Sequence, residues 1–282
     1  MTQHWVWVTG PDYYLDEDGN ENPELDPDRG YSTDDWWTCH KDTRAGDLVL
    51  LYRSTVKKDV AYLIRTTTDA HPLDEAQVQE FGRGHQCGFE VLQRLPRPIP
   101  LAEMKADPVV ATWPALRAAF VKSAWAVPDD VWARILELAG VTTAVLESRI
   151  VAANKVDTLE KTICRELKEK SQLLKAQGLD FKELIIEKAP GPGAGRADLI
   201  GFGRVKNPKV VIEVKKGRVG PGAVGQVVRY RDALITKYRP GRAIEGVLIG
   251  ESIDRDALVL MRHLPRLRFI ALADLDLDCL RA

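Results

Sequence analysis

Short apolar runs separated by turn residues predict the strands of the C-terminal half of the chain. Each run is rich in Val, Ile, Leu or Phe and is bounded by Gly, Pro or polar residues, which is typical of buried strands. The runs are 184–186, 198–202, 210–214, 246–250 and 267–271. Helical spacing predicts helices at 223–238 and 254–263, and a helical region over 142–177 that is interrupted near Asp157, which resembles an N-cap. This order predicts an α/β core with a mixed sheet between helices.

The N-terminal half shows the same signals with a less regular spacing. Strands are predicted near 4–9, 45–52, 60–66 and 88–92, and helices over 113–120 and 129–139. Residues 12–30 are acidic, rich in turn residues and poor in apolar ones, so they are predicted to form a long surface loop. We therefore predict a small α+β domain over 1–140, a linker helix over 141–154 and a second domain over 155–282.

Charge is distributed unevenly along the 282 residues, although the net charge is only −1. Residues 151–282 carry 25 Lys and Arg against 17 Asp and Glu, whereas residues 1–150 carry 15 against 24. Ten of the acids lie within 12–35. A basic C-terminal half fits a polyanionic partner, because Lys and Arg displace counterions from phosphates. The alternative is an ordinary solvated surface.

The composition also narrows the class of protein. No run of eighteen or more apolar residues exists, so we expect no membrane-spanning helix. The four cysteines, Cys39, Cys87, Cys164 and Cys279, are widely scattered and form no C-x-x-C pair. A zinc site or a disulfide framework is therefore not expected, and together with a start that does not resemble a signal peptide this favours a cytoplasmic protein.

Two carboxylates and a lysine stand out at the ends of two predicted strands. Asp198 opens one strand, and Glu213 closes the next, with Lys215 two residues later. Across a hairpin the start of one strand faces the end of its partner, and residues two apart in a strand share a face. This set suits phosphodiester hydrolysis. The carboxylates offer hard oxygen ligands for Mg²⁺, which polarises the phosphate and acidifies water, while the lysine stabilises developing charge.

Each of these residues, taken alone, is weak evidence for a catalytic site. A Glu-x-Lys on a strand is more often a solvated face, and an Asp after a glycine loop is more often a turn residue. Their joint spacing favours a catalytic site. Gln226 and Tyr230 downstream favour it too, because they are four residues apart and share a helix face. Taken alone, that pair too is typical of an ordinary helix surface.

Three stretches resemble the PD-(D/E)xK nuclease superfamily, and most of all its RecB-like and NucS mismatch-endonuclease branch. They are 196–201, 211–216 and the Gln-x-x-x-Tyr of Gln226 and Tyr230, so the resemblance covers roughly residues 155–250. It implies that Asp198 and Glu213 bind Mg²⁺ or Mn²⁺, that Lys215 completes the catalytic set, and that Gln226 and Tyr230 line the site. A glutamate on the first helix often joins the metal in this superfamily. Glu160 is the candidate here, with Glu166 as the second choice.

The resemblance has one departure and leaves one further acid to consider. Ala197 stands before Asp198 where the superfamily pattern has proline, at a position that varies within the superfamily. Glu187 ends the strand before the glycine loop and is an alternative metal ligand. A plain surface acid is the simpler interpretation of Glu187.

The N-terminal half resembles an EVE domain of the PUA-like superfamily, a small barrel. The stretches that carry this resemblance are 5–8, 35–38, 45–52 and 98–101, and it covers about residues 1–140. Domains of this group often accept a modified base flipped from the duplex, and aromatic stacking offsets the cost of flipping. All seven tryptophans lie in this half; Trp5 and Trp7 are expected in the core. The expected base pocket consists of Trp36, Trp37, Ser32, Tyr52 and Ser54.

A domain that recognises a modified base (residues 1–140), joined to a nuclease domain, predicts a modification-dependent restriction endonuclease. The expected partner is double-stranded DNA with a modified base, most simply a modified cytosine such as 5-methylcytosine, and the expected assembly is a homodimer. A mismatch or repair endonuclease is an alternative within enzymes. A catalytically inactive DNA-binding module is an alternative outside them, and the intact Asp198, Glu213 and Lys215 argue against it. The modified base, its sequence context and the cutting distance do not follow from the sequence.

Overall fold

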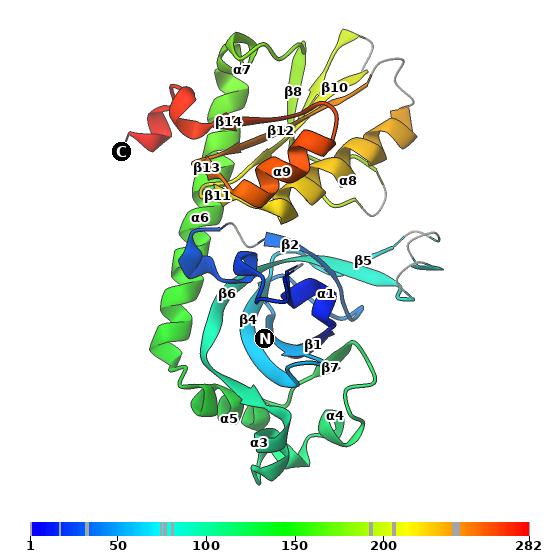
Figure 1. Cartoon of the computed structure of the whole chain (residues 1–282), viewed down its shortest axis with the longest axis vertical. Coiled ribbons are helices and arrows are strands. Elements are labelled where there is room, and N and C mark those ends of the chain that lie inside the picture. Colours follow the sequence, from blue (N-terminus) through cyan, green and yellow to red (C-terminus); the bar gives the residue numbers. More distant parts are fainter. Residues whose placement is uncertain are drawn as a thin grey trace. The chain divides into compact units, whose positions relative to one another are not determined.

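The chain forms two compact units in its structure, which is a computed structural model (Figure 1). It describes residues 2–16, 18–31, 34–73, 75, 78–79, 82–191, 194–204, 207–238 and 243–281. The N-terminal unit contains the described residues of 2–29 and 34–153. The C-terminal unit contains those from Asn154 onward, and also Gly30 and Tyr31 from the N-terminal half. Helix α6 (Thr143–Glu169) contributes residues to both units.

A curled seven-stranded sheet forms the centre of the N-terminal unit (Figure 1). Its strands are β1 (His4–Thr9), β2 (Asp34–Thr38), β3 (Leu48–Arg53), β4 (Asp59–Thr66), β5 (His71–Pro72), β6 (His85–Pro100) and β7 (Ala124–Ala126). The order is β2-β6-β4-β3-β1-β7, and β5 also pairs with β6. Only the β1–β3 pair is parallel among the described strands of this sheet. The long β6 is irregularly paired with β4, and such bulges bend a sheet.

Short helices complete the N-terminal unit and cover both faces of its sheet. They are α1 (Pro11–Tyr14), η1 (Pro23–Leu25), η2 (Pro27–Arg29), α3 (Leu101–Ala106), η3 (Val110–Thr112), α4 (Pro114–Arg117) and α5 (Asp129–Ala139). One core contains Trp113 and Trp132 with the apolar face of α5. A second core contains Trp5 and Trp7, as expected, together with Tyr14 of α1. The sheet is therefore buried on both sides.

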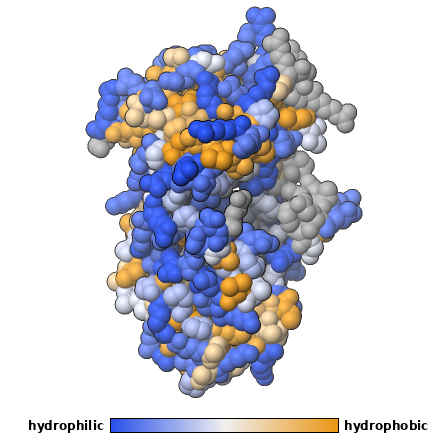
Figure 2. All heavy atoms as spheres, viewed as in Figure 1, coloured by the Kyte–Doolittle hydropathy of each residue, from blue (hydrophilic) through white to orange (hydrophobic). Residues whose placement is uncertain are grey.

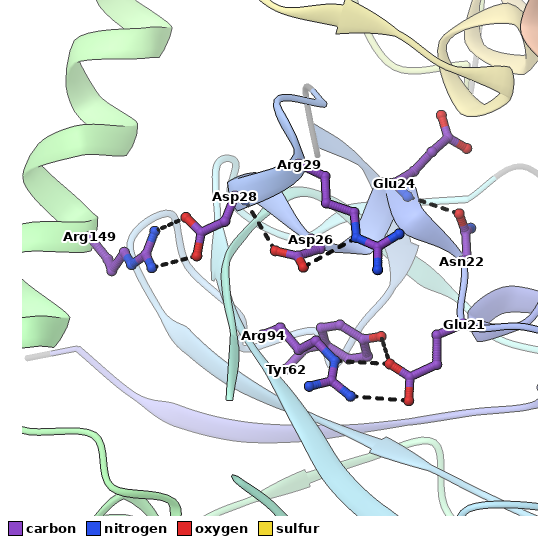
Figure 3. A network of polar contacts seen from close by, with 9 residues as sticks. All are labelled: Glu21, Asn22, Glu24, Asp26, Asp28, Arg29, Tyr62, Arg94 and Arg149. Carbon is purple, nitrogen blue, oxygen red and sulfur yellow. Dashed lines mark hydrogen bonds and ion pairs between the residues drawn. The ribbon is translucent and has the colours of Figure 1, made fainter. Parts of the chain in front are cut away.

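The acidic segment 12–29 lies partly at the surface, as expected, with exposed residues at 12, 16, 18–20 and 28–29, but it is also anchored to the sheet. Tyr14 and Leu25 are buried in the core. The Glu21 carboxylate accepts hydrogen bonds from Arg94 at 2.9 and 3.2 Å (Figure 3). It also lies 2.8 Å from the buried Arg53 guanidinium. The acids of this segment are thus partly neutralised by arginines from distant strands, a pairing that composition does not reveal.

The C-terminal unit is built on a five-stranded mixed sheet in the order β14-β12-β10-β9-β8. These strands are β8 (Glu183–Lys188), β9 (Ala197–Phe202), β10 (Pro208–Val214), β12 (Glu245–Gly250) and β14 (Leu267–Ala271). Strands β8, β9 and β10 are antiparallel neighbours, whereas β10, β12 and β14 are parallel. A small second sheet joins β11 (Arg218–Val219) to β13 (Ser252–Ile253). The five strands predicted from apolar runs are confirmed.

Helices lie on both faces of this sheet. One core packs Ile163 and Leu167 of α6 and Leu174 of α7 (Gln172–Ala176) against the sheet. The other packs α8 (Pro221–Tyr238) and α9 (Arg255–His263) against the opposite face. The chain ends in η5 (Leu272–Asp274) and η6 (Asp278–Leu280). The predicted sheet between helices is therefore confirmed, as are the helices predicted at 223–238 and 254–263.

The helix break predicted near Asp157 is wrong. Helix α6 runs without interruption from Thr143 to Glu169. Asp157 pairs with Lys161 across one turn, with 2.8 Å between carboxylate and ammonium, instead of capping a new helix. The reason is tertiary packing: Ile150 and Ala153 pack on the N-terminal core and Ile163 on the C-terminal core, which stabilises the helix on both sides of Asp157.

Hydrophilic side chains make up most of the surface seen in Figure 2, with apolar areas between them. Leu258, Val259 and Leu260 of α9 are among the exposed apolar residues. None of the helices within the described residues is both long and apolar enough to cross a membrane.

Candidate active site

The register of β9 and β10 brings Asp198 and Glu213 together. Ile212 pairs with Leu199, so the next residue of β10, Glu213, lies opposite Asp198 at the start of β9. Directly opposed residues of two strands project from the same face of a sheet. The backbone N–H of Val214 donates a 2.7 Å hydrogen bond to Oδ2 of Asp198, which fixes the carboxylate at this edge. The juxtaposition expected from the hairpin is therefore present.

Lys215 completes a buried group of charges. Its Nζ lies 2.9 Å from Oε1 of Glu213, and both residues are almost wholly buried, at 1% and 3% exposure. Burial raises the pKa of Asp198, and the negative charge of Glu213 raises it further, whereas the ammonium of Lys215 opposes this. Two carboxylates, of which Asp198 is half-buried, thus lie near one cation, an arrangement that favours binding of a further cation.

Helix α8 places Gln226 and Tyr230 on the same side of the sheet as the acids. Both residues are buried. Burial raises the pKa of Tyr230, and the charge of Glu213 contributes next, so the phenol is close enough to interact with the carboxylate. Gly195 has a φ of +80° and lies beside the Tyr230 ring, since a Cβ built on it would be 3.7 Å from the phenol oxygen. The glycine loop therefore packs closely on Tyr230.

The two glutamates proposed for the first helix have different surroundings. Oε1 of Glu160 accepts a 2.6 Å hydrogen bond from the backbone N–H of Lys216, the residue after Lys215. Glu166 instead accepts hydrogen bonds from Lys170 and from the backbone N–H groups of Asp278 and Cys279, at 2.7, 2.6 and 3.0 Å. Glu160 thus lies beside the segment that carries Lys215, whereas Glu166 binds the C-terminal segment.

The predicted metal ligands were Asp198, Glu213 and Glu160. Among the described residues, no three His, Cys, Asp or Glu side chains are grouped so that they could hold a metal ion together. Oε1 of Glu160 is bonded to the Lys216 backbone, and the role of Glu160 as a metal ligand stays a prediction. Asp198 and Glu213 form a pair of hard oxygen donors at this edge. Such a pair fits Mg²⁺, which binds through one or two carboxylates together with substrate phosphates and water.

Cys164 of α6 is a buried residue that feels the charge of the acids and that the sequence predictions did not name. Burial raises the pKa of its thiol, and the negative charges of Asp198, Glu213 and Glu160 raise it further. Cys164 lies four residues after Glu160, and this helical spacing could have placed both on one face of α6. The alternative acid Glu187 is exposed, with its carboxylate 3.9 Å from Arg196.

The tryptophans of the expected base pocket lie next to each other on β2 and face opposite ways. Trp37 packs on the N-terminal core, with its ring centre 4.5 Å from that of Tyr13. Trp36 is half-buried and lies opposite Gly88 of β6. A Cβ on Gly88 would come within 2.6 Å of Oγ1 of Thr67, so this threonine lies against the residue that faces Trp36.

Two other members of the expected base pocket lie at the end of β3. Tyr52 is buried in the core and stacks on Phe120, with 4.3 Å between ring centres. Ser54 follows β3 and donates a 2.7 Å hydrogen bond from Oγ to the carbonyl of Thr9. In the order of the sheet, β4 and β6 stand between β3 and β2. The expected pocket stays a prediction for these residues, and Ser32 lies outside the described residues.

Comparison with known proteins found weak structural likenesses. No protein-family model and no curated protein matches the chain. The human THYN1 protein, solved in complex with 5-methylcytosine-containing DNA, is 17% identical over 49% of this chain and 98% of its own, with a TM-score of 0.34. A repair endonuclease from Pyrococcus abyssi is 27% identical over 39% of this chain and 45% of its own, with a TM-score of 0.33. Protein Atu2648 from Agrobacterium tumefaciens is 16% identical over 50% and 96%, with a TM-score of 0.39. TM-scores this low assign neither a fold family nor an activity to the chain.

Proposed function

We propose that this chain is a modification-dependent DNA endonuclease of the restriction type. Its N-terminal unit recognises a modified base, most simply a modified cytosine, and its C-terminal unit hydrolyses a phosphodiester. The observation that carries the proposal is the group formed by the half-buried Asp198 and the buried Glu213 and Lys215 at one edge of the C-terminal sheet. Paired carboxylates with one buried ammonium are costly to the fold unless they serve a reaction or a cation.

Each residue of this group has a distinct role in the proposed reaction. Asp198 and Glu213 are the ligands of Mg²⁺ or Mn²⁺. A bound divalent cation supplies Lewis-acid polarisation of the scissile phosphate and lowers the pKa of the attacking water. Lys215 orients that water and offsets the charge that develops on the phosphate oxygens. Glu160 positions the strand end through its hydrogen bond to Lys216.

Gln226 and Tyr230 close the site from the side of α8. Both are buried, and the charges of Glu213 and Asp198 act on Tyr230, so we propose that the pair restricts access of bulk water and orients the substrate phosphate. The excess of Lys and Arg in residues 151–282 supports DNA as the substrate, because it supplies a sequence-independent attraction to phosphates.

Trp36 is the residue that we propose stacks on the flipped base. It is half-buried on the face of β2 that Trp37 does not use, so its ring is accessible in part. Hydroxyl groups are close by, since Thr68 accepts a 2.8 Å hydrogen bond from the N–H of Gly88, which lies opposite Trp36. A stacking surface with adjacent polar groups suits recognition of a base by its face and its edge.

A homodimer is the proposed active assembly. One hydrolytic site cuts one strand at each engagement, so a double-strand break favours two copies, and homodimers are the commonest oligomers. Analytical ultracentrifugation with and without DNA tests this. A monomer under both conditions, with efficient double-strand cleavage, contradicts the proposed assembly.

Cleavage of matched duplexes tests the proposed function. DNA of one sequence is prepared unmodified, with 5-methylcytosine and with other modified cytosines, and each duplex is incubated with Mg²⁺, with Mn²⁺ or with a chelator. We expect cleavage of a modified duplex only when the divalent ion is present. Preferential cleavage of a mismatched duplex would favour the repair endonuclease instead. Binding without cleavage under every condition would favour the inactive DNA-binding module.

A further inference from the structure

The chain segment that follows Lys215 is held by backbone hydrogen bonds along one edge. The N–H of Lys215 donates a 2.8 Å hydrogen bond to the carbonyl of Ile249, and the N–H of Glu251 donates one of 3.0 Å to the carbonyl of Gly217. Strand β11 then pairs with β13. The position of Lys215 therefore depends on how the whole segment 215–219 is fixed.

The other edge of this segment is held by residues from the N-terminal half of the chain. The N–H of Arg218 donates a 2.8 Å hydrogen bond to the carbonyl of Gly30. Tyr31 forms a parallel bridge with Arg218. Gly30 and Tyr31 thus add a third strand beside β11, and they belong to the C-terminal unit although their sequence neighbours do not.

Side chains reinforce this third strand. The hydroxyl of Tyr31 donates a 2.6 Å hydrogen bond to Oδ2 of Asp254, and the guanidinium of Arg218 lies 5.5 Å from the centre of the Tyr31 ring. The second oxygen of Asp254 caps α9 by accepting a 2.8 Å hydrogen bond from the N–H of Asp256. Tyr31 is therefore linked both to the strand after Lys215 and to the start of a helix.

Gly217 makes the close approach of Gly30 possible. A Cβ on Gly217 would lie 2.5 Å from the carbonyl oxygen of Gly30, a distance that no real side chain tolerates. Only glycine at position 217 allows the backbone of Gly30 to come this near to the segment that carries Lys215.

We propose that Tyr31 is a positioning residue for Lys215. This inference rests on the proposed function. Tyr31 and Gly30 hold Arg218 through the backbone hydrogen bond, the bridge and the ring contact. Arg218 lies three residues after Lys215, so this support keeps the segment that carries the Lys215 ammonium in the geometry needed for hydrolysis.

The variants Y31A and Y31F test the role of Tyr31 by removing different parts of its side chain. Y31A removes the ring from Arg218 and the hydroxyl from Asp254, whereas Y31F removes the hydroxyl alone. We expect Y31A to lower the single-turnover cleavage rate on modified DNA at least tenfold, and Y31F to lower it less, while the Kd for modified DNA stays within about twofold. Y238F, which removes the hydroxyl of another tyrosine of the same unit, is the matched control and should cleave normally.

Hydrogen exchange provides a readout that needs neither metal nor cleavage. Mass spectrometry of peptides that cover 215–219 reports the Arg218 amide, which is bonded to Gly30. Y31A should speed the exchange of the Arg218 amide several-fold relative to the native chain. G217A, which displaces Gly30, should have the same effect as Y31A.

The outcomes separate this inference from the proposed function. A native chain that cleaves no DNA refutes the proposed function, and the exchange experiment still tests whether Tyr31 holds the segment after Lys215. A native chain that is active, with Y31A and Y31F as active as the native chain and with unchanged exchange at Arg218 in Y31A, refutes the role of Tyr31. Thermal unfolding of each variant identifies any that fails to fold, in which case Y31F alone decides.

Discussion

Nζ of Lys215 lies 2.9 Å from Oε1 of Glu213, two positions earlier in the chain, and both side chains are buried. Residues at this spacing share one face of an extended strand, so the pair follows from the local backbone. Asp198 approaches the pair from the neighbouring strand, and the charge of Glu213 raises its pKa. The concentration of charge at this point motivates the first prediction.

Replacing any member of the group should abolish cleavage and spare DNA binding. D198N and K215M should each lower the cleavage rate at least about a hundredfold, because transition-state charge loses a preorganised partner. E213Q should do the same. DNA binding, measured by fluorescence anisotropy with a chelator present, should change little. D232N, at an exposed acid of α8, is the control. Full activity in any one of the three variants contradicts the assigned site.

Substitution of Glu160 should affect cleavage, whereas substitution of Glu166 should affect stability. E160Q keeps an oxygen for the Lys216 N–H but loses the charge, so it should reduce cleavage with little change in stability. E166Q weakens three hydrogen bonds to a carboxylate and should cost about 1–3 kcal/mol in the free energy of unfolding, with cleavage retained. Urea unfolding and a cleavage assay check both. The reverse assignment of effects would show that Glu166, and not Glu160, serves the site.

The contribution of Glu166 should also depend on pH. Burial raises its pKa, but hydrogen bonds from Lys170 and from the backbone of Asp278 and Cys279 outweigh burial and lower it from 4.5 to about 2. A carboxylate with a lowered folded-state pKa stabilises the fold above its unfolded pKa. The stability difference between the native chain and E166Q should therefore be constant above about pH 5.5 and shrink as the pH falls from 4.5 towards 2. A difference that is independent of pH would refute this role.

Trp36 and Trp37 should respond differently to substitution. W36A should lower the preference for modified over unmodified DNA roughly ten- to a hundredfold, because one stacking contact is worth about 1–3 kcal/mol. W37A removes a ring that packs on Tyr13 and the core, and should instead cost about 3 kcal/mol in stability. Binding is best measured in full-length D198N, which prevents cleavage. Unchanged discrimination in W36A would remove Trp36 from the base site.

Glu21 should anchor the acidic segment. Its pKa is lowered to about 2 because hydrogen bonds from Arg94 and Arg53 outweigh the effect of burial. E21Q should cost about 1–3 kcal/mol in the free energy of unfolding and speed proteolysis within 12–29. The cost is limited because Arg53 keeps two hydrogen bonds of 2.7 Å to Asp59. D12N, at an exposed acid of the same segment, should have no effect. Equal behaviour of E21Q and D12N would show that the arginine pairing contributes nothing.

The sequence alone determined which segments of the C-terminal unit form strands and that Asp198 meets Glu213. Both depend on local information. Apolar runs and turn residues set the strand limits, and the antiparallel hairpin between β9 and β10 leaves one register that buries Leu199 and Ile212 on the same face. The spacing of Glu213 and Lys215 needed only the two-residue repeat of a strand.

Tertiary structure alone decided what the same local patterns left open. Helical spacing places Glu160 and Glu166 on different sides of α6, but only packing selects the side that reaches Lys216. Alternation places Trp36 and Trp37 on opposite faces, but only the core shows which face is buried. Glu21 pairs with Arg94, which is 73 residues away in the sequence. Such pairs form because burial brings distant charges together in a medium of low polarity, and no local pattern encodes that partner.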